Sequence, residues 1–403
     1  MSPEETVAVR APSCDRTEAD AIVIGGGIYG LMIALEAGQA GYRVLLLERD
    51  TIGAATSANW FRILHGGLRY LQSLDFPRVL ESIAERRWFL QFAPDLVRPM
   101  RFLMPLYGNG SRRPAMFRAA FMADAVLGMR RNAGLGPDQR LARGRVLDSA
   151  ATLALCSGLQ PEGLQGGALW YDAIADDSGQ LMARIRRQVE ATGGSVREGM
   201  AARDLLTEQG NVIGVWAGRC GQPAELFRAP VVINAAGPWS DRLAERFGLV
   251  SPNFFRPSLA FNLLLDIEPP AELGVAVSPP GATRPTLFVY PQGRQSFVGT
   301  WHARWPGAID SPTVPEAEVA AFLETLNAAL PVLQARRRDV VAIFPGLLPA
   351  QSMGGVEPAH HEVIHDYGAA GGPAGLFSVS GVKFTTARRV AEKLVRRLPA
   401  RSR

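Results

Sequence analysis

The sequence predicts an α/β fold, and the strongest evidence lies between residues 20 and 50. Residues 21–24 form a short apolar run, which is typical of a buried parallel strand. They lead directly into a turn with glycines at 25, 26, 27 and 30, and residues 31–41 then form a helix that ends near a glycine. Residues 43–50 repeat the apolar strand pattern. This order of elements indicates the first half of a Rossmann-like unit that binds a dinucleotide.

Each glycine of the turn has a separate predicted task. Gly25 permits the tight turn, Gly27 lets the backbone approach a pyrophosphate, and Gly30 lets the helix pack closely on the strand. The N-terminus of that helix would offer free N–H groups and a positive dipole end to phosphate. Glu48 ends the second strand, 18 residues after Gly30. An acid at this position binds the ribose hydroxyls of adenosine and disfavours the 2′-phosphate of NADP.

The segment after Glu48 favours a flavin over a nicotinamide. A nicotinamide-binding domain would continue into another helix and strand, but small and hydroxyl residues follow here, Ala54 to Ser57, and then the pair Gly66 and Gly67. Such residues let the backbone lie against a flat ring and donate N–H groups to it. By itself, this pattern only suggests a flavin.

Composition narrows the class of protein. The chain has 403 residues, 47% of them hydrophobic, which indicates a globular protein of two or three domain-sized units. Its net charge of +5 suits an anionic substrate or an anionic membrane surface. It has no long run of Lys and Arg, which argues against a nucleic-acid partner.

The cysteine pattern and the lack of a signal-peptide-like stretch predict a cytoplasmic protein. The three cysteines are scattered and form no Cys-x-x-Cys pair, which suggests a reducing compartment and excludes an ordinary metal ribbon. Residues 1–17 are polar, have no apolar stretch typical of a signal peptide, and are expected to be flexible. No stretch is apolar enough to span a bilayer.

The rest of the chain alternates between helical and strand patterns. Residues 73–150 are expected to be helical, with the clearest spacing of apolar residues over 76–96. Residues 111–131 are basic at both ends and apolar between, which fits either a core-facing amphipathic helix or a peripheral contact with an anionic membrane. Three further patterns are a helix over 179–192 capped by residues 176–178, a strand–turn–strand over 199–217, and a second sheet within 251–340.

The chain resembles FAD-dependent glycerol-3-phosphate dehydrogenases of the glycine/D-amino-acid oxidase superfamily. The resemblance starts with IVIGGGIYG, VLLLERD and ATSANWFRILHGGLRYL and continues to residue 107. It returns in VVINAAGPWSDRLAERFG at 231–248, LFVYPQGRQSFVGT at 287–300 and LFSVSGVKFTTARRVAEKLV at 376–395. These pieces occur in the family's order and span about residues 20 to 397.

The resemblance implies an FAD-binding domain of the glutathione-reductase type and an interleaved α+β substrate domain on a mixed or antiparallel sheet. The FAD-binding domain is expected to comprise residues 18–72, 158–250 and 341–400, and the substrate or cap domain residues 73–157 and 251–340. No Cys lies in a flavin-contacting motif, so FAD is expected to bind non-covalently.

Residues throughout the matching pieces are expected to bind FAD. Gly381 and the N–H groups of residues 382–385 are expected to open a helix that stabilises negative charge on the reduced flavin, and Lys383 would add a full charge. The predicted FAD-binding residues are Gly25, Gly27, Ile28, Gly30, Glu48, Arg49, Thr56, Ser57, Leu64, His65, Gly66, Gly67, Ala202, Ala236, Gly237, Trp239, Gly346, Gly381, Lys383, Phe384 and Thr385.

The substrate side matches the family less completely. Arg69 and Tyr70 match residues that help to hold the substrate, and Lys383 with Thr385 or Thr386 matches the opposite wall. Arg and Lys converging on one space suit an anion such as phosphate or carboxylate. Several family positions differ: Leu259 stands for a Lys, Asn262 for a His, Leu348 for an Arg, and Trp301-His302 for Thr-Asp.

These departures predict a substrate other than glycerol 3-phosphate itself. We expect an anionic polyol or hydroxy acid in a more apolar pocket, lined by Phe261, Tyr290, Trp301 and Leu348. The predicted substrate-binding residues are Arg69, Tyr70, Asn262, Tyr290, Trp301 and Leu348. The predicted catalytic residues are His65, Arg69, His302 and Lys383, with His65 and His302 both open as the base that removes a substrate proton.

Alternatives remain open for the function and the partners. An amine or amino-acid oxidase of the same superfamily is the main rival, possibly in a biosynthetic tailoring step, and a non-catalytic flavoprotein subunit is a second one. The electron acceptor is expected to be O2 or a quinone, the latter at the inner face of a membrane. The histidines at 360, 361 and 365 invite a metal interpretation, but no fixed carboxylate partner is obvious, so no metal is predicted.

Overall fold

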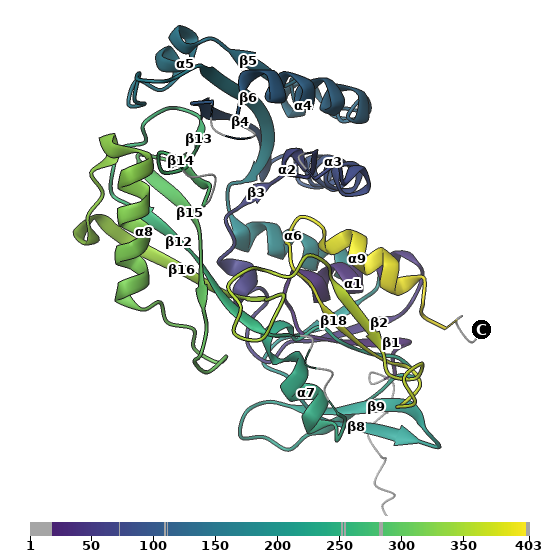
Figure 1. Cartoon of the computed structure of the whole chain (residues 1–403). Coiled ribbons are helices and arrows are strands. Elements are labelled where there is room, and N and C mark those ends of the chain that lie inside the picture. The colour runs from purple at the N-terminus through teal and green to yellow at the C-terminus, as the bar shows by residue number, and fades with distance from the viewer. Residues whose placement is uncertain are drawn as a thin grey trace, which may run out of the picture.

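The computed structural model describes residues 18–71, 73–108, 110, 112–250, 253, 255–281 and 285–399. The predicted flexible segment 1–17 lies outside these residues. Three sheets and their helices make up the described chain, with the parallel sheet and the largest sheet side by side (Figure 1). The α/β fold predicted from the sequence is confirmed.

The first sheet contains the predicted dinucleotide-binding unit. Its six strands, in spatial order, are β17 (Val363–Asp366), β18 (Leu376–Ser380), β11 (Val232–Asn234), β1 (Ala21–Ile24), β2 (Val44–Leu47) and β7 (Ser195–Arg197). Parallel pairing joins β1 to both β2 and β11, and β11 to β18, while β17 closes one edge in antiparallel fashion.

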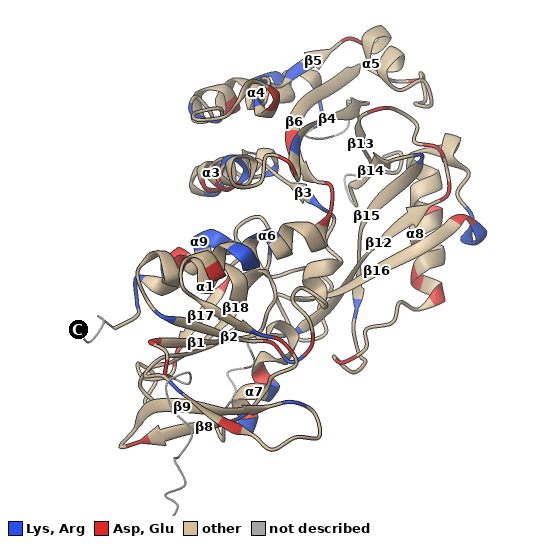
Figure 2. Cartoon of the chain, turned by 180° about the vertical axis from the view of Figure 1, so that it is seen from behind, with Lys and Arg blue, Asp and Glu red and all other residues tan. Residues whose placement is uncertain are grey.

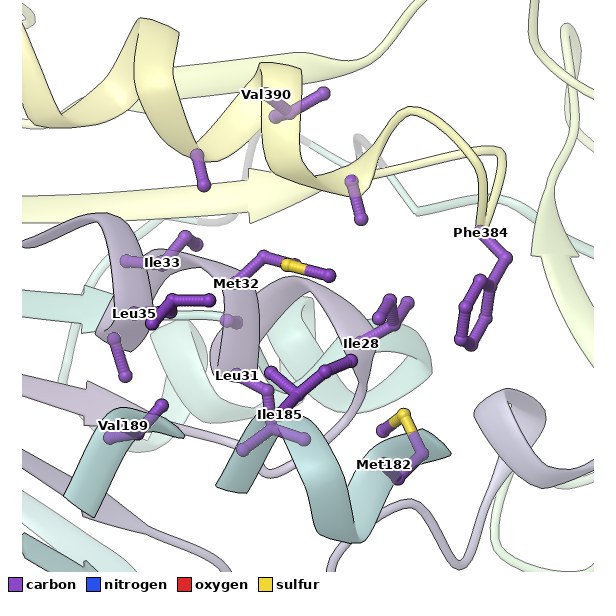
Figure 3. Packing of buried hydrophobic residues seen from close by; sticks show 14 of the residues in the cluster. Ile28, Leu31, Met32, Ile33, Leu35, Met182, Ile185, Val189, Phe384 and Val390 are labelled. Atoms are coloured by element: carbon purple, nitrogen blue, oxygen red, sulfur yellow. The ribbon is translucent and has the colours of Figure 1, made fainter. Parts of the chain in front are cut away.

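Helix α1 (Ile28–Gln39) is the centre of the hydrophobic core beside this sheet. It packs between α6 (Ser178–Ala191) and α9 (Ala387–Val395), as Figure 3 shows for Ile28 and Met32. Met182 and Ile185 of α6 reach it from one side and Val390 of α9 from the other. Asp177 caps α6 by accepting a hydrogen bond from the Gln180 N–H at 2.9 Å, as the sequence predicts. This packing holds the N-terminus of α1 in place.

The largest sheet is mixed, as expected. The strands, in spatial order, are β16 (Val340–Pro349), β12 (Pro257–Leu265), β15 (Gln295–Arg304), β14 (Leu287–Gln292), β13 (Gly274–Val277), β4 (Val97–Leu106), β6 (Gly166–Ala175) and β3 (Ile63–Leu64), with β5 (Arg145–Leu147) beside β6. Neighbouring strands pair antiparallel except for β13 with β4.

This sheet draws on segments that the sequence analysis had divided between two domains. β3, β6 and β16 belong to it, although residues 18–72, 158–250 and 341–400 were assigned to the FAD-binding domain. The predicted domain boundaries remain a prediction.

The expectation that residues 73–150 are all helical is wrong. Helices α3 (Phe76–Phe92) and α4 (Pro114–Leu127) are present, but β4 and β5 lie between and after them. Pro99 and Pro105 lie within β4, and proline inside a helix removes a hydrogen bond and clashes with the preceding turn. The ten residues of β4 instead form a ladder along the whole of β6.

A third sheet and four further α-helices lie in the rest of the described chain. β8 (Ala201–Glu208), β9 (Asn211–Gly218) and β10 (Glu225–Arg228) form a three-stranded antiparallel sheet, which includes the strand pair predicted over 199–217. The other helices are α2 (Leu68–Leu71), α5 (Ser149–Leu155), α7 (Ser240–Arg246) and α8 (Glu316–Ala329). None of the described helices is long and apolar enough to cross a membrane.

Candidate active site

The glycine turn leaves open space only where a cofactor phosphate is expected. A Cβ on Gly25, whose φ is +109°, would lie 2.5 Å from the Ala235 carbonyl oxygen, and one on Gly30 would lie 1.8 Å from the Gly25 carbonyl oxygen. At Gly27, a Cβ would meet only the Ser57 hydroxyl at 3.2 Å. Gly25 and Gly30 therefore serve backbone packing, whereas Gly27 keeps the N-terminus of α1 accessible.

Other predicted FAD-binding residues surround this turn. Glu48 accepts hydrogen bonds from the N–H groups of Gly26 at 2.5 Å and Asp50 at 2.8 Å. Ser57 accepts one from the Ile28 N–H at 2.9 Å. The guanidinium of Arg49 lies 4.0 Å from the centre of the Trp239 ring. Segments 25–30, 48–57 and 235–239 thus meet at one end of the parallel sheet.

The other predicted segments lie on the side of the large sheet. The Thr56 hydroxyl is 3.2 Å from both the N–H and the carbonyl of Leu347, and a Cβ on Gly346 would lie 3.0 Å from the Thr56 methyl. Trp60 stacks on Phe384 with ring centres 3.8 Å apart. Trp60 was not predicted as part of the site, because an aromatic residue in a mostly polar segment has no local signature. Ala202 lies on β8, two residues after Met200, whose N–H donates to the Glu48 carbonyl.

The turn Leu64 to Gly67 is held by a residue that sequence reasoning missed. Asp172, in the middle of β6, accepts a hydrogen bond from the Gly66 N–H at 2.7 Å and lies 3.2 Å from Nδ1 of His65. The Asp172 residue is only 3% exposed, whereas the His65 side chain is 47% exposed. The available signal was one carboxylate within the otherwise apolar run 166–175.

The predicted helix at Gly381 begins six residues later, at Ala387, which corrects the expectation. A Cβ on Gly381 would lie 1.7 Å from the Tyr29 ring. The Tyr29 hydroxyl donates to the Lys383 carbonyl at 2.8 Å and accepts from the Lys383 N–H at 3.1 Å. Burial raises the pKa of Tyr29, so the phenol remains a donor. These two bonds hold the segment in a non-helical turn.

Three of the predicted catalytic residues influence the same space electrostatically. Burial, and then the charge of Arg69, lowers the pKa of Lys383 to about 8, although part of the lysine side chain stays exposed. Burial and Arg69 also lower the pKa of His302 to about 4. The Lys383 ammonium lies 4.2 Å from the centre of the Tyr70 ring. The arrangement concentrates positive charge beside a neutral imidazole, which suits an anionic ligand.

The large sheet presents some of the predicted substrate residues to this side. His302 on β15 pairs with Ala260 on β12, and Ala260 pairs with Gly346 on β16. All three residues therefore share one face of the large sheet. Leu348 lies two residues after Gly346 and therefore shares that face. Thr56 lies over Gly346, so this face is the one that meets the segment 54–67.

Of four other predicted residues, Asn262 and Tyr290 lie on this face but bond to the segment 54–67, whereas Phe261 and Trp301 lie on the opposite face. Phe261 and Trp301 pack on Phe322 of α8, on the opposite face, because adjacent strand residues alternate in direction. The Asn262 amide is occupied by the Asn59 carbonyl at 2.8 Å and the Thr300 hydroxyl at 2.9 Å. The Tyr290 side chain is fully buried.

Two of the histidines between residues 360 and 365 have protein partners. His361 lies 2.9 Å from the guanidinium of Arg78, whereas His365 contacts the ring of Tyr367 edge-on. Within the described residues, no group of three His, Cys, Asp or Glu side chains is arranged to hold a metal ion.

A family of known proteins accounts for this arrangement. Residues 20–396 match the DAO family model, which is described as FAD dependent oxidoreductase. The chain belongs to the DAO family of FAD-dependent oxidoreductases. The glycine turn fits this cofactor, since it leaves the N-terminus of α1 open at Gly27 and places an acid, Glu48, beside it.

The similar curated proteins are oxidoreductases of glycerol phosphate by name. The chain is 31% identical to glycerol-3-phosphate dehydrogenase 2 of Mycobacterium tuberculosis, covering 95% of this chain and 64% of that protein. It is 27% identical to glycerol-3-phosphate dehydrogenase of Synechocystis, covering 95% and 70%, and 28% identical to alpha-glycerophosphate oxidase of Streptococcus pyogenes, covering 86% and 56%. The chain thus spans 56 to 70% of these relatives' length.

Solved structures confirm the fold. Glycerol-3-phosphate dehydrogenase of Bacillus halodurans, in complex with FAD, superposes with a TM-score of 0.70 at 23% identity, covering 94% of this chain and 64% of that one. Glycine oxidase of Geobacillus kaustophilus superposes with a TM-score of 0.67 at 17% identity, covering 95% and 96%. The same fold therefore occurs in proteins named for alcohol oxidation and for amine oxidation.

Proposed function

We propose that this FAD-dependent oxidoreductase oxidises the CH–OH group of a small anionic polyol or hydroxy acid. The observation that carries the proposal is the approach of the Lys383 ammonium to the ring of Tyr70, the neighbour of Arg69, at 4.2 Å. The charge of Arg69 accordingly helps to lower the pKa of both Lys383 and His302. Bound FAD supplies a hydride acceptor at flavin N5. The chain's own residues then bind the anion, orient the CH–OH group and accept its proton.

The residues divide these tasks according to their charge. Arg69 and Lys383 are cationic at neutral pH and hold the anionic group of the substrate. His302, with a pKa of about 4, is neutral and too weak a base to keep a proton. We assign proton removal to His65, which is half exposed beside the turn Gly66–Gly67. His302 is left to donate or accept a hydrogen bond.

Glycerol 3-phosphate is a poor fit on the side of β16. Leu348 shares the face of His302 and is only partly buried, so an apolar side chain borders the space around the substrate. Apolar contact costs a phosphate its hydration without replacing the hydrogen bonds. The relatives named for glycerol phosphate support the CH–OH chemistry, and Leu348 supports a substrate that carries an apolar group beside its anion.

Anaerobic reduction of the bound flavin tests the proposal. Anionic hydroxy acids or polyols should bleach the visible flavin absorbance, and glycerol 3-phosphate should do so slowly. Amines and amino acids, tested in the same panel, should leave the absorbance unchanged. Bleaching by amines alone would replace the proposal with amine oxidation. A stably yellow protein that no compound reduces would identify a non-catalytic flavoprotein subunit.

We also propose that the surface of α4 contacts an anionic membrane, where a quinone would serve as electron acceptor. Four apolar side chains on this helix or just after its end are more than half exposed: Met116, Met122, Val126 and Met129. A groove of about 300 Å³ adjoins them and is bordered by the arginines Arg118, Arg143 and Arg145. Within the described residues the side chains of these arginines have neither ion pairs nor hydrogen bonds. Figure 2 shows basic residues on both α4 and β5. Exposed methionines beside unpaired arginines suit the boundary between headgroups and acyl chains.

Sedimentation with lipid vesicles measures this contact. The protein should sediment with vesicles rich in phosphatidylglycerol, should do so less at high salt, and should stay in solution with phosphatidylcholine. The double variant Met122→Glu/Met129→Glu should abolish binding to the anionic vesicles. Met353→Glu changes a methionine that is 69% exposed on a distant loop and is the matched control. Equal binding of both variants, or no binding of the unaltered protein, would contradict the proposal and leave O2 as the acceptor to test.

A further inference from the structure

Asp172 is the most completely bonded carboxylate beside the candidate site. Beyond the Gly66 N–H at 2.7 Å, it accepts hydrogen bonds from the Trp170 indole at 3.1 Å and from the Arg86 guanidinium. Its other neighbour is His65 Nδ1 at 3.2 Å. Two buried residues, Asp172 and Arg86, are thus paired directly behind an exposed histidine.

The surroundings keep Asp172 ionised. Burial alone would raise the pKa of its carboxyl, but the hydrogen bond from His65 and the charge of Arg86 outweigh burial and lower the pKa below its usual value. A carboxylate can only accept hydrogen bonds. The His65 nitrogen that faces it must therefore carry a hydrogen, which leaves Nε2 with a free lone pair on a half-exposed ring.

We propose that Asp172 is a positioning residue that holds His65 in the Nδ1-protonated form, so that Nε2 takes the substrate proton. This inference rests on the proposed function. The substrate O–H bond breaks as its proton moves to Nε2, and the electron pair of that bond forms the carbonyl C=O; bound FAD would accept the hydride released from the carbon. Asp172 stabilises the imidazolium that forms, because the new positive charge lies beside a buried negative one.

A second role of Asp172, holding the Gly66 N–H and Arg86, must be separated from this one. Asp172→Asn keeps an acceptor oxygen for Gly66 but offers an NH2 group in place of an ionised oxygen. Trp170→Phe is the matched control, because it removes one hydrogen bond to Asp172 and leaves the His65 contact intact. Retention of FAD and an unchanged melting temperature identify variants that fold normally.

NMR of histidine labelled with ¹⁵N tests the proposal without any substrate. The chain has only five histidines, so the His65 signals are identified by their loss in His65→Asn. In its neutral form, His65 should show a protonated Nδ1 and an unprotonated Nε2, in the unaltered protein and in Trp170→Phe. Asp172→Asn should shift His65 toward the Nε2-protonated form. The same Nε2-protonated form in the unaltered protein would overturn the proposal.

Flavin reduction kinetics provide the second test. Removing a general base lowers such a rate by about 10²- to 10⁴-fold, and His65→Asn and Asp172→Asn should each fall in this range. The double variant should be no slower than His65→Asn, because both changes remove one unit. Additive losses would show that Asp172 acts through the fold alone. A protein that no compound reduces would contradict the proposed function, whereas the NMR result would still decide the role of Asp172.

Discussion

Gly27→Ala is expected to weaken FAD binding strongly while leaving the fold intact. Gly27 has φ −71° and ψ 179°, a conformation that alanine adopts without strain, and its Cβ would meet only the Ser57 hydroxyl at 3.2 Å. The added methyl would instead occupy the approach of the pyrophosphate to the N-terminus of α1. We expect FAD affinity to fall by about 100-fold or more, which is about 2.8 kcal/mol at 1.4 kcal/mol per factor of ten.

Titration of apoprotein with FAD, followed by visible absorbance, measures this loss, and thermal unfolding of the apoprotein measures stability. Gly136→Ala is the matched control, since a Cβ there meets nothing within 4 Å. Gly30→Ala should behave differently and lower the melting temperature, because its Cβ would lie 1.8 Å from the Gly25 carbonyl oxygen. Unchanged FAD affinity in Gly27→Ala would show that the cofactor does not approach this turn.

Lys383→Met is expected to weaken binding of the anionic substrate by about 10- to 100-fold, the loss typical of one charge-assisted contact of about 1.5–3 kcal/mol. The pKa of Lys383 is depressed to about 8, so the ammonium is present below pH 8 and lost above it. Substrate affinity of the unaltered protein should therefore fall as the pH rises through about 8. Lys383→Arg should keep the affinity at high pH, because a guanidinium does not titrate there.

The dependence of flavin reduction on substrate concentration, measured across pH, provides these affinities. The chain has only two lysines, so ¹⁵N-labelled lysine provides two signals from which the pKa of Lys383 is read directly. Lys393→Met is the control. Lys393 lies on α9, and its ammonium is paired with the Glu362 carboxylate at 2.6 Å. A Lys383→Met variant that binds the anion normally at every pH would remove Lys383 from the substrate site.

Local patterns were sufficient for the first strand, glycine turn, helix and strand of the cofactor-binding unit. At Gly25 and Gly30 the turn depends on close backbone packing that glycine alone satisfies, so these residues are visible in the sequence. The cap of α6 at Asp177 is equally local, since donor and acceptor are three residues apart. Comparison with known families then confirmed the cofactor as FAD.

Only the tertiary structure decided which side chains meet. Trp301 and His302 are neighbours in the sequence, but pleating sends them to opposite faces of the large sheet. Which face of the sheet meets the segment 54–67 depends on the register of β12, β15 and β16, and composition does not encode register. Asp172 reaches His65 across 107 positions because β3 pairs with β6. Such contacts depend on long-range pairing, whereas the glycine turn depends only on its own backbone.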